Sequence, residues 1–334
     1  MGSEMCIRDR ANTDPKDELI RPLSHLQGKK PPAPAWFENA LAITPQTGTV
    51  EVQGASIHFS VWGEENLPGI LLVHGGRAHR KWWYPFAPFL MERFRVAAVD
   101  LSGLGDSDWR ERYSLKCHAE EIFAVTKAAG LDRVNRPLVI GHSFGGWVTM
   151  GAVEMAGERL GGAVVIDSPF GVSDPDEGYS IKMKKERKDQ PVANRLYETA
   201  EQPISRFRLL PSQPGEQHYL LDYIARNGLQ EHHDKQSGEK GWRWKFDPGH
   251  GTNFDIQFDR DLFLAARCPL AFIYGEKSMF AQGEGAEHVR KLAHGRAPFI
   301  MIPEGHHHLM MDQPLAFISA LRTLLTSWPI RVGF

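Results

Sequence analysis

The stretch that decides the fold is PLVI at 137–140, followed by Gly141-His142-Ser143-Phe144-Gly145-Gly146. The four apolar residues are typical of a short strand covered on both faces, and a helical pattern follows over 144–156. The pattern G-x-S-x-G between a strand and a helix predicts a sharp turn in which close neighbours of the serine must be small. The hydroxyl would then project from the sheet edge at a helix N-terminus, whose partial positive charge favours developing negative charge. The alternative is a glycine-rich turn with an incidental serine.

Strand and helix patterns alternate on both sides of this stretch. Further apolar runs lie at 69–73, 95–99, 162–166, 269–274 and 298–302. Helical patterns lie at about 81–93, 114–129, 283–293 and 314–327. Two alternating stretches, 49–53 and 56–62, flank Gly54-Ala55 and predict a hairpin. We therefore predict an α/β fold with a mostly parallel sheet and helices on both faces.

The composition excludes several classes of protein. Among 334 residues, 39 Lys and Arg stand against 41 Asp and Glu, so there is no basic excess for binding nucleic acid or a membrane surface. No apolar stretch approaches the roughly 20 residues of a membrane helix. The 3 cysteines form neither a metal pattern nor a disulfide framework. They fit a reducing compartment, so we expect a cytoplasmic protein.

Two segments fall outside the alternating pattern. Residues 1–35 are polar and proline-punctuated, which is typical of a disordered leader, and residues 4–10 look like a translated sequencing adapter. Residues 169–267 contain no buried-strand run, and a structureless loop of this length is uncommon. We predict that they form a helical cap over the sheet edge, inserted between the two parts of the core at 36–168 and 268–334.

Four motifs follow successive predicted strands. They are His74-Gly75-Gly76, the D-x-x-G-x-G-x-S sequence at 100–107, the serine turn at 141–146, and Pro303-Glu304-Gly305-His306-His307-His308 before Asp312-Gln313-Pro314. In order and spacing they resemble the α/β-hydrolase superfamily over about 50–328. The resemblance implies an eight-stranded sheet with a cap inserted after the sixth strand.

The resemblance also implies a base and an acid for the serine, since serine alone is a poor nucleophile. The family pattern P-x-x-G-H-x-x-x-x-[DE]-x-P places the base at His307. The family often has its acid in a G-x-x-D loop, but here the loop reads Gly275-Glu276-Lys277-Ser278. Some family members take the acid from the end of the preceding strand, where this chain has Asp167. We favour Asp167, with Glu276 as the alternative acid.

The family's oxyanion donors correspond to the backbone N–H groups of Phe144 and Gly76. The resemblance thus implies a serine hydrolase for small or medium carboxylic esters that needs no cofactor. No metal is expected, since adjacent histidines in one loop cannot all face one ion. A serine nucleophile argues against the dehalogenase and epoxide hydrolase branches, which use aspartate.

Several alternatives remain open on the same residues. They are a lactonase, a carbon–carbon bond hydrolase, a perhydrolase and a non-catalytic ligand receptor. We expect a small-molecule ester or lactone as the partner, and no nucleic acid or membrane. The sequence contains no indication of the oligomeric state or of the actual substrate.

Overall fold

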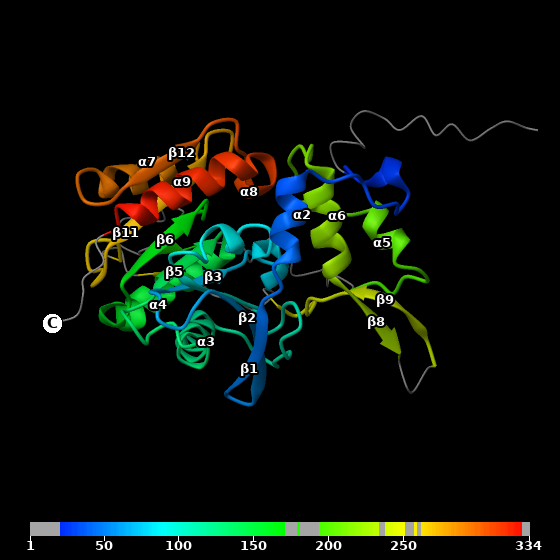
Figure 1. Cartoon of the computed structure of the whole chain (residues 1–334), viewed down its shortest axis with the longest axis horizontal. Helices are drawn as coiled ribbons and strands as arrows, with labels where there is room; N and C mark the ends of the chain where they lie inside the picture. Colours follow the sequence, from blue (N-terminus) through cyan, green and yellow to red (C-terminus); the bar gives the residue numbers. More distant parts are fainter. Residues whose placement is uncertain are drawn as a thin grey trace, which may run out of the picture.

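An eight-stranded sheet carries the fold, with the strand order β1-β2-β4-β3-β5-β6-β11-β12 (Figure 1). The computed structural model describes residues 21–170, 179–180, 194–233, 238–250, 257–258, 262–282 and 284–328. The strands are β1 Gln46–Val52, β2 Ala55–Trp62, β3 Gly69–Val73, β4 Arg95–Val99, β5 Leu138–His142, β6 Gly162–Ile166, β11 Leu270–Gly275 and β12 Phe299–Ile302. β2 pairs antiparallel with β1 and β4, and every other pair in this sheet is parallel. The predicted mostly parallel, eight-stranded sheet is confirmed.

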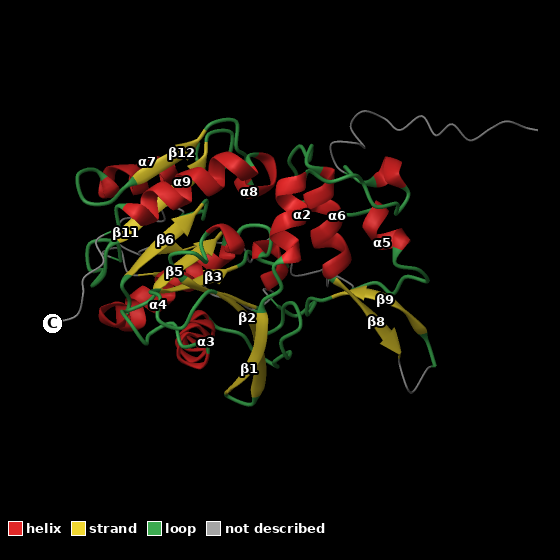
Figure 2. Cartoon of the chain, in the orientation of Figure 1, coloured by secondary structure: helices red, strands yellow, loops and turns green. Residues whose placement is uncertain are grey.

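Both faces of the sheet are covered, as the continuous apolar runs predict. Strands β3, β4, β5 and β6 are buried along their whole length. Alternate residues of β3 enter different cores, Leu71 and Val73 on one face and Ile70 and Leu72 on the other. Helices lie on both sides (Figure 2). The first core includes residues of α3 Leu115–Ala128, α4 Phe144–Ala156 and α7 Glu284–Ala293, and the second includes residues of α8 Leu309–Asp312 and α9 Pro314–Thr326.

One predicted helix, over 81–93, is wrong. The structure has only two short 3-10 turns there, η2 Arg80–Trp83 and η3 Ala87–Phe89. Pro85 and Pro88 each lack a backbone N–H and clash with the preceding turn, so a continuous helix cannot form. The apolar spacing reflects burial of Trp83 and Phe86 from these turns instead.

The register of the parallel strands determines where the motifs emerge. His142 of β5 and Ile273 of β11 both pair with Ile166 of β6, and Gly275 pairs with Ile302 of β12. The carboxyl ends of four strands are therefore aligned, and the residues that follow them share one edge of the sheet, where α/β folds bind ligands. These following residues are Ser143, Asp167, Glu276 and Pro303.

The segment predicted as a helical cap contains strands as well as helices. Its helices are α5 Glu201–Ser205 and α6 His218–Asn227, and its strands are β7 Tyr179–Ser180, β8 Leu229–His233, β9 Lys240–Trp244 and β10 Gln257–Phe258. β8 pairs antiparallel with β9, and β7 with β10. Trp242 and Trp244 are two positions apart in β9, so both lie on one side of this strand, where they pack against the second core. The boundaries at 169 and 267 stay predictions, since residues 171–178 and 259–261 lie outside the described residues.

The predicted leader over 1–35 extends too far into the chain. Leu23 is fully buried, and Arg226 of α6 donates a hydrogen bond to the Gly28 carbonyl oxygen at 2.5 Å. Helix α2 (Ala35–Ala42) lies alongside α6 in Figure 1, and the Phe37 ring packs 5.0 Å from the ring of Tyr219. Residues 21–35 are therefore part of the fold because the inserted segment covers them. The rest of the predicted leader, residues 1–20, lies outside the described residues.

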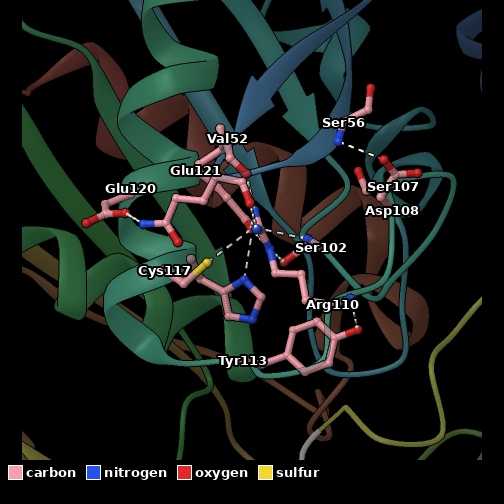
Figure 3. Close-up of polar contacts among 12 residues, drawn as sticks. Val52, Ser56, Ser102, Ser107, Asp108, Arg110, Tyr113, Cys117, Glu120 and Glu121 are labelled. Atoms are coloured by element: carbon pink, nitrogen blue, oxygen red, sulfur yellow. Dashed lines mark hydrogen bonds and ion pairs between the residues drawn. The ribbon is translucent and has the colours of Figure 1, made fainter.

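A buried ionic network joins α3 to the first hairpin (Figure 3). Arg110 donates to the Val52 carbonyl oxygen at 2.7 Å and to Glu121 at 3.0 Å, and the other Glu121 oxygen lies 2.9 Å from His118 Nδ1. Burial would raise the pKa of Glu121, but His118 and the Ser102 N–H hold that pKa at about 2. The network thus keeps a carboxylate charged inside the protein.

Among the described residues, no helix is long and apolar enough to cross a membrane.

Candidate active site

Ser143 stands at a sharp turn between β5 and α4. Its backbone has φ 52° and ψ −118°, a conformation that side-chain-bearing residues rarely adopt. A Cβ on Gly141 would overlap the Gly145 carbonyl oxygen, and one on Gly145 would lie 2.5 Å from the His74 carbonyl oxygen. Neither glycine of the G-x-S-x-G pattern could therefore be replaced by a larger residue without a clash. The turn leaves Ser143 partly exposed at the N-terminus of α4, as the sequence predicts.

His307 is hydrogen-bonded to the serine. Its Nε2 lies 2.9 Å from Ser143 Oγ, and its Nδ1 lies 3.0 Å from Asp167 Oδ1. Burial lowers the pKa of His307 to about 3, so its imidazole is neutral at pH 7. Asp167 can only accept when ionised, so Nδ1 carries the proton and Nε2 presents a lone pair to the Ser143 hydroxyl.

Asp167 follows β6 directly and is completely buried. Its φ of 44° lies in the left-handed region that aspartate tolerates better than most residues. Asp167 Oδ2 accepts from the Gly275 N–H at 2.8 Å, and Oδ1 accepts from the Ser278 hydroxyl at 2.5 Å. Burial raises the pKa of Asp167 to about 7, and these two donors oppose that rise.

Glu276, the alternative acid, lies elsewhere on the same edge. Its side chain is exposed, and Oε2 accepts from the Glu304 N–H at 3.0 Å. The structure brings Asp167, rather than Glu276, into hydrogen bonding with His307. The serine that replaces the usual aspartate of the loop, Ser278, instead contacts Asp167.

Each of the three consecutive histidines has its own partner. His306 donates its backbone N–H to Asp312 at 2.7 Å, and His308 donates its backbone N–H to Gln213 Oε1 at 2.8 Å. Gln213 comes from the inserted segment and also donates to Asp312 at 2.9 Å. The residues on both sides of His307 are thereby held in place. Sequence reasoning missed Gln213, because nothing in its neighbourhood marks it as a partner of a loop 95 positions later.

His142, the residue before the serine, contacts the backbone of the histidine loop. Its Nε2 lies 2.9 Å from the His307 carbonyl oxygen, which can only accept, so Nε2 donates. Burial lowers the pKa of His142 to about 3, which keeps this ring neutral. The residue before the serine therefore positions the backbone of His307.

The loop after β3 runs beside the serine turn. A Cβ on Gly75 would lie 3.4 Å from Ser143 Cβ, and one on Gly76 would lie 3.7 Å from Phe144 Cβ. His74 braces this loop, because its Nδ1 lies 2.8 Å from the Gly75 carbonyl oxygen and its Nε2 accepts from the Leu101 N–H. Gly76 is exposed and lies beside Phe144, the residue that directly follows the serine, so the two predicted oxyanion residues are neighbours.

Several histidines lie at this edge of the sheet. Within the described parts of the chain, no group of three or more His, Cys, Asp and Glu side chains is arranged to hold a metal ion. The histidines of the site are instead engaged with Ser143, Asp167, Asp312 and Gln213.

The chain is similar in sequence to curated proteins. Over 279 residues the chain is 26% identical to an esterase of Mycobacterium tuberculosis, covering 82% of this chain and 88% of that protein. It is also 26% identical over 289 residues to a 1-acylglycerol-3-phosphate O-acyltransferase of Arabidopsis thaliana, covering 77% and 66% respectively.

Solved structures share the fold. A thioesterase domain from the curacin biosynthetic pathway superposes with a TM-score of 0.65 at 19% identity, covering 85% of this chain and all of that domain (100%). The model of the alpha/beta hydrolase family matches residues 70–320, which include the serine turn, the loop after β3 and the histidine loop. The chain belongs to the alpha/beta hydrolase family.

Proposed function

We propose that the protein is a serine hydrolase that cleaves carboxylic esters of small or medium substrates through an acyl-enzyme intermediate. The observation that carries the proposal is the continuous hydrogen-bond chain from Asp167 through His307 to Ser143. A neutral imidazole with its free lone pair toward a serine hydroxyl is the arrangement that nucleophilic catalysis requires.

In the first half of the proposed reaction, Ser143 Oγ attacks the ester carbonyl carbon while its proton passes to His307 Nε2. Asp167 stabilises the imidazolium that forms, across the 3.0 Å contact to Nδ1. The backbone N–H groups of Phe144 and Gly76 stabilise the oxyanion, and the positive end of α4 adds to this. The carbon–oxygen bond to the alcohol then breaks, and His307 returns the proton to the alcohol as it leaves.

In the second half, water replaces the alcohol. His307 takes a proton from the water, hydroxide adds to the acyl carbonyl, and the bond to Ser143 Oγ breaks with return of the proton to the serine. The products are the free acid and the unchanged enzyme. Lactone opening, carbon–carbon cleavage and perhydrolysis would use the same groups, so the substrate panel below includes them.

The deciding experiment combines labelling with turnover. The parent protein should react with a fluorophosphonate probe at one residue, Ser143, and hydrolyse p-nitrophenyl esters. Ser143→Ala should lose labelling and at least about 10⁴-fold in kcat. Ser205→Ala is the matched control, since the Ser205 hydroxyl donates to the neighbouring Gln202 carbonyl oxygen on α5. Turnover that survives in Ser143→Ala would overturn the proposal.

The same panel separates the alternatives. Acetate, butyrate and decanoate esters test chain length, and γ-butyrolactone, a vinylogous 1,5-diketone and acetate with hydrogen peroxide test the other three reactions. A parent that binds these compounds without turning any of them over would favour the ligand receptor.

A further inference from the structure

The loop after β11 departs from its family at one position, Ser278, and that side chain is completely buried beside Asp167. Its donor direction is fixed by its surroundings. Ser278 Oγ accepts a hydrogen bond from the Phe280 N–H at 3.1 Å, so the hydroxyl proton is directed to Asp167 Oδ1 at 2.5 Å. Ser278 therefore acts as a donor to the carboxylate.

The loop that carries Ser278 is held rigidly against the sheet edge. The Lys277 N–H donates to the Gly305 carbonyl oxygen at 2.8 Å, and the Ser278 N–H donates to the Gly275 carbonyl oxygen at 3.0 Å. Gly275 packs so closely against the histidine loop that a Cβ there would overlap the Gly305 carbonyl oxygen. The loop thus offers Asp167 two fixed donors, the Gly275 N–H and the Ser278 hydroxyl.

These two donors and His307 account for three hydrogen bonds to one buried carboxylate. Oδ1 is shared between Ser278 and His307 Nδ1, so the Ser278 hydroxyl fixes the oxygen that faces the histidine. A carboxylate in an apolar site stays ionised only when such donors stabilise its charge. Loss of the hydroxyl would weaken both the orientation and the charge of Asp167.

We propose that Ser278 is a positioning residue that holds Asp167 for His307. The inference rests on the proposed function.

The first test removes the hydroxyl. Ser278→Ala should lower kcat for p-nitrophenyl butyrate by about tenfold to a hundredfold with little change in KM, which is the loss expected for one hydrogen bond to a charged group. The acid limb of the kcat/KM profile should move to higher pH by about one unit, because Asp167 loses a donor that favours its ionised form. Ser278→Thr keeps the hydroxyl and should restore the profile. An unchanged pH profile and kcat in Ser278→Ala would overturn the positioning role.

The second test separates misfolding from misplacement of Asp167. Ser278→Ala should unfold in urea as a single cooperative transition, and Ser143 of the folded variant should still be labelled by the fluorophosphonate probe, but more slowly than in the parent. Labelling of folded Ser278→Ala at the parent's rate would overturn the positioning role. A parent without turnover or labelling would instead overturn the proposed function itself.

Discussion

Replacement of Asp167 by asparagine is expected to trap His307 in the wrong tautomer. The Gly275 N–H donates to Oδ2 at 2.8 Å, so the amide oxygen of the variant must occupy the Oδ2 position. The amide NH₂ then takes the Oδ1 position, 3.0 Å from His307 Nδ1, and donates to it. The Ser278 hydroxyl, which donates to Oδ1 in the parent, can turn its proton away and accept the second amide hydrogen. The imidazole proton is forced onto Nε2, which faces Ser143 Oγ at 2.9 Å and can no longer accept the serine proton. Rotation of the amide by 180° would place two N–H groups against each other at Gly275.

In serine hydrolases this loss of the correct tautomer costs about 10⁴-fold in kcat. This corresponds to about 5.5 kcal/mol of transition-state stabilisation. The assay is the initial rate of p-nitrophenyl butyrate hydrolysis at saturating substrate. Glu276→Gln is the matched control, since its amide oxygen can still accept from the Glu304 N–H, and it should stay within about twofold of the parent. Asp167→Asn with more than a tenth of the parent kcat would refute the reasoning, as would a Glu276→Gln variant that is inactive.

Three further substitutions test the supporting structure. Gln213→Leu removes the acceptor of the His308 N–H and should lower kcat about tenfold in steady-state kinetics, with little change in KM. A variant with the same kcat as the parent would contradict this prediction. Glu121→Gln leaves Arg110 buried without a charged partner and should lower the free energy of unfolding in urea by about 3 kcal/mol at pH 7. The folded pKa of Glu121 is lowered from 4.5 to about 2, so this contribution is full above 4.5 and should disappear as the pH falls toward 2. Gly141→Ala drives a Cβ into the Gly145 carbonyl oxygen and should cost about 3 kcal/mol of stability in the same assay, and an unchanged stability would contradict it.

Much of the sheet could be predicted, because its signals are local. The runs at 69–73, 95–99 and 162–166 match their strands residue for residue. No helix forms over 81–93, because the two prolines inside it outweigh the apolar spacing. Burial of residues 21–35 depends on α6, whose Arg226 lies 198 positions from Gly28, and a short polar stretch carries no sign of such a partner.

The site residues likewise differ in whether a local sequence pattern or a distant contact identifies them. Ser143 and His307 stand in motifs of neighbouring residues, so sequence spacing was enough to single them out. The choice between Asp167 and Glu276 depends on a contact of Asp167 with His307 across 140 positions, which the pairing of β6 with β11 and of β11 with β12 brings about. The partner roles of Ser278 and Gln213 are hydrogen bonds of ordinary polar residues, and no local pattern predicts them.

The contact of Gln213 with the histidine loop has a consequence for how the enzyme can be re-engineered or diversified. The inserted segment and the core are often regarded as independent modules, with one selecting substrates and the other doing chemistry. Here the inserted segment supplies an anchor for the loop of the proposed base. A segment transplanted from a relative should therefore work only if it carries a side chain with both a donor and an acceptor at this position. Under the proposed function, exchange of the inserted segment should therefore be constrained by the side-chain amide of Gln213.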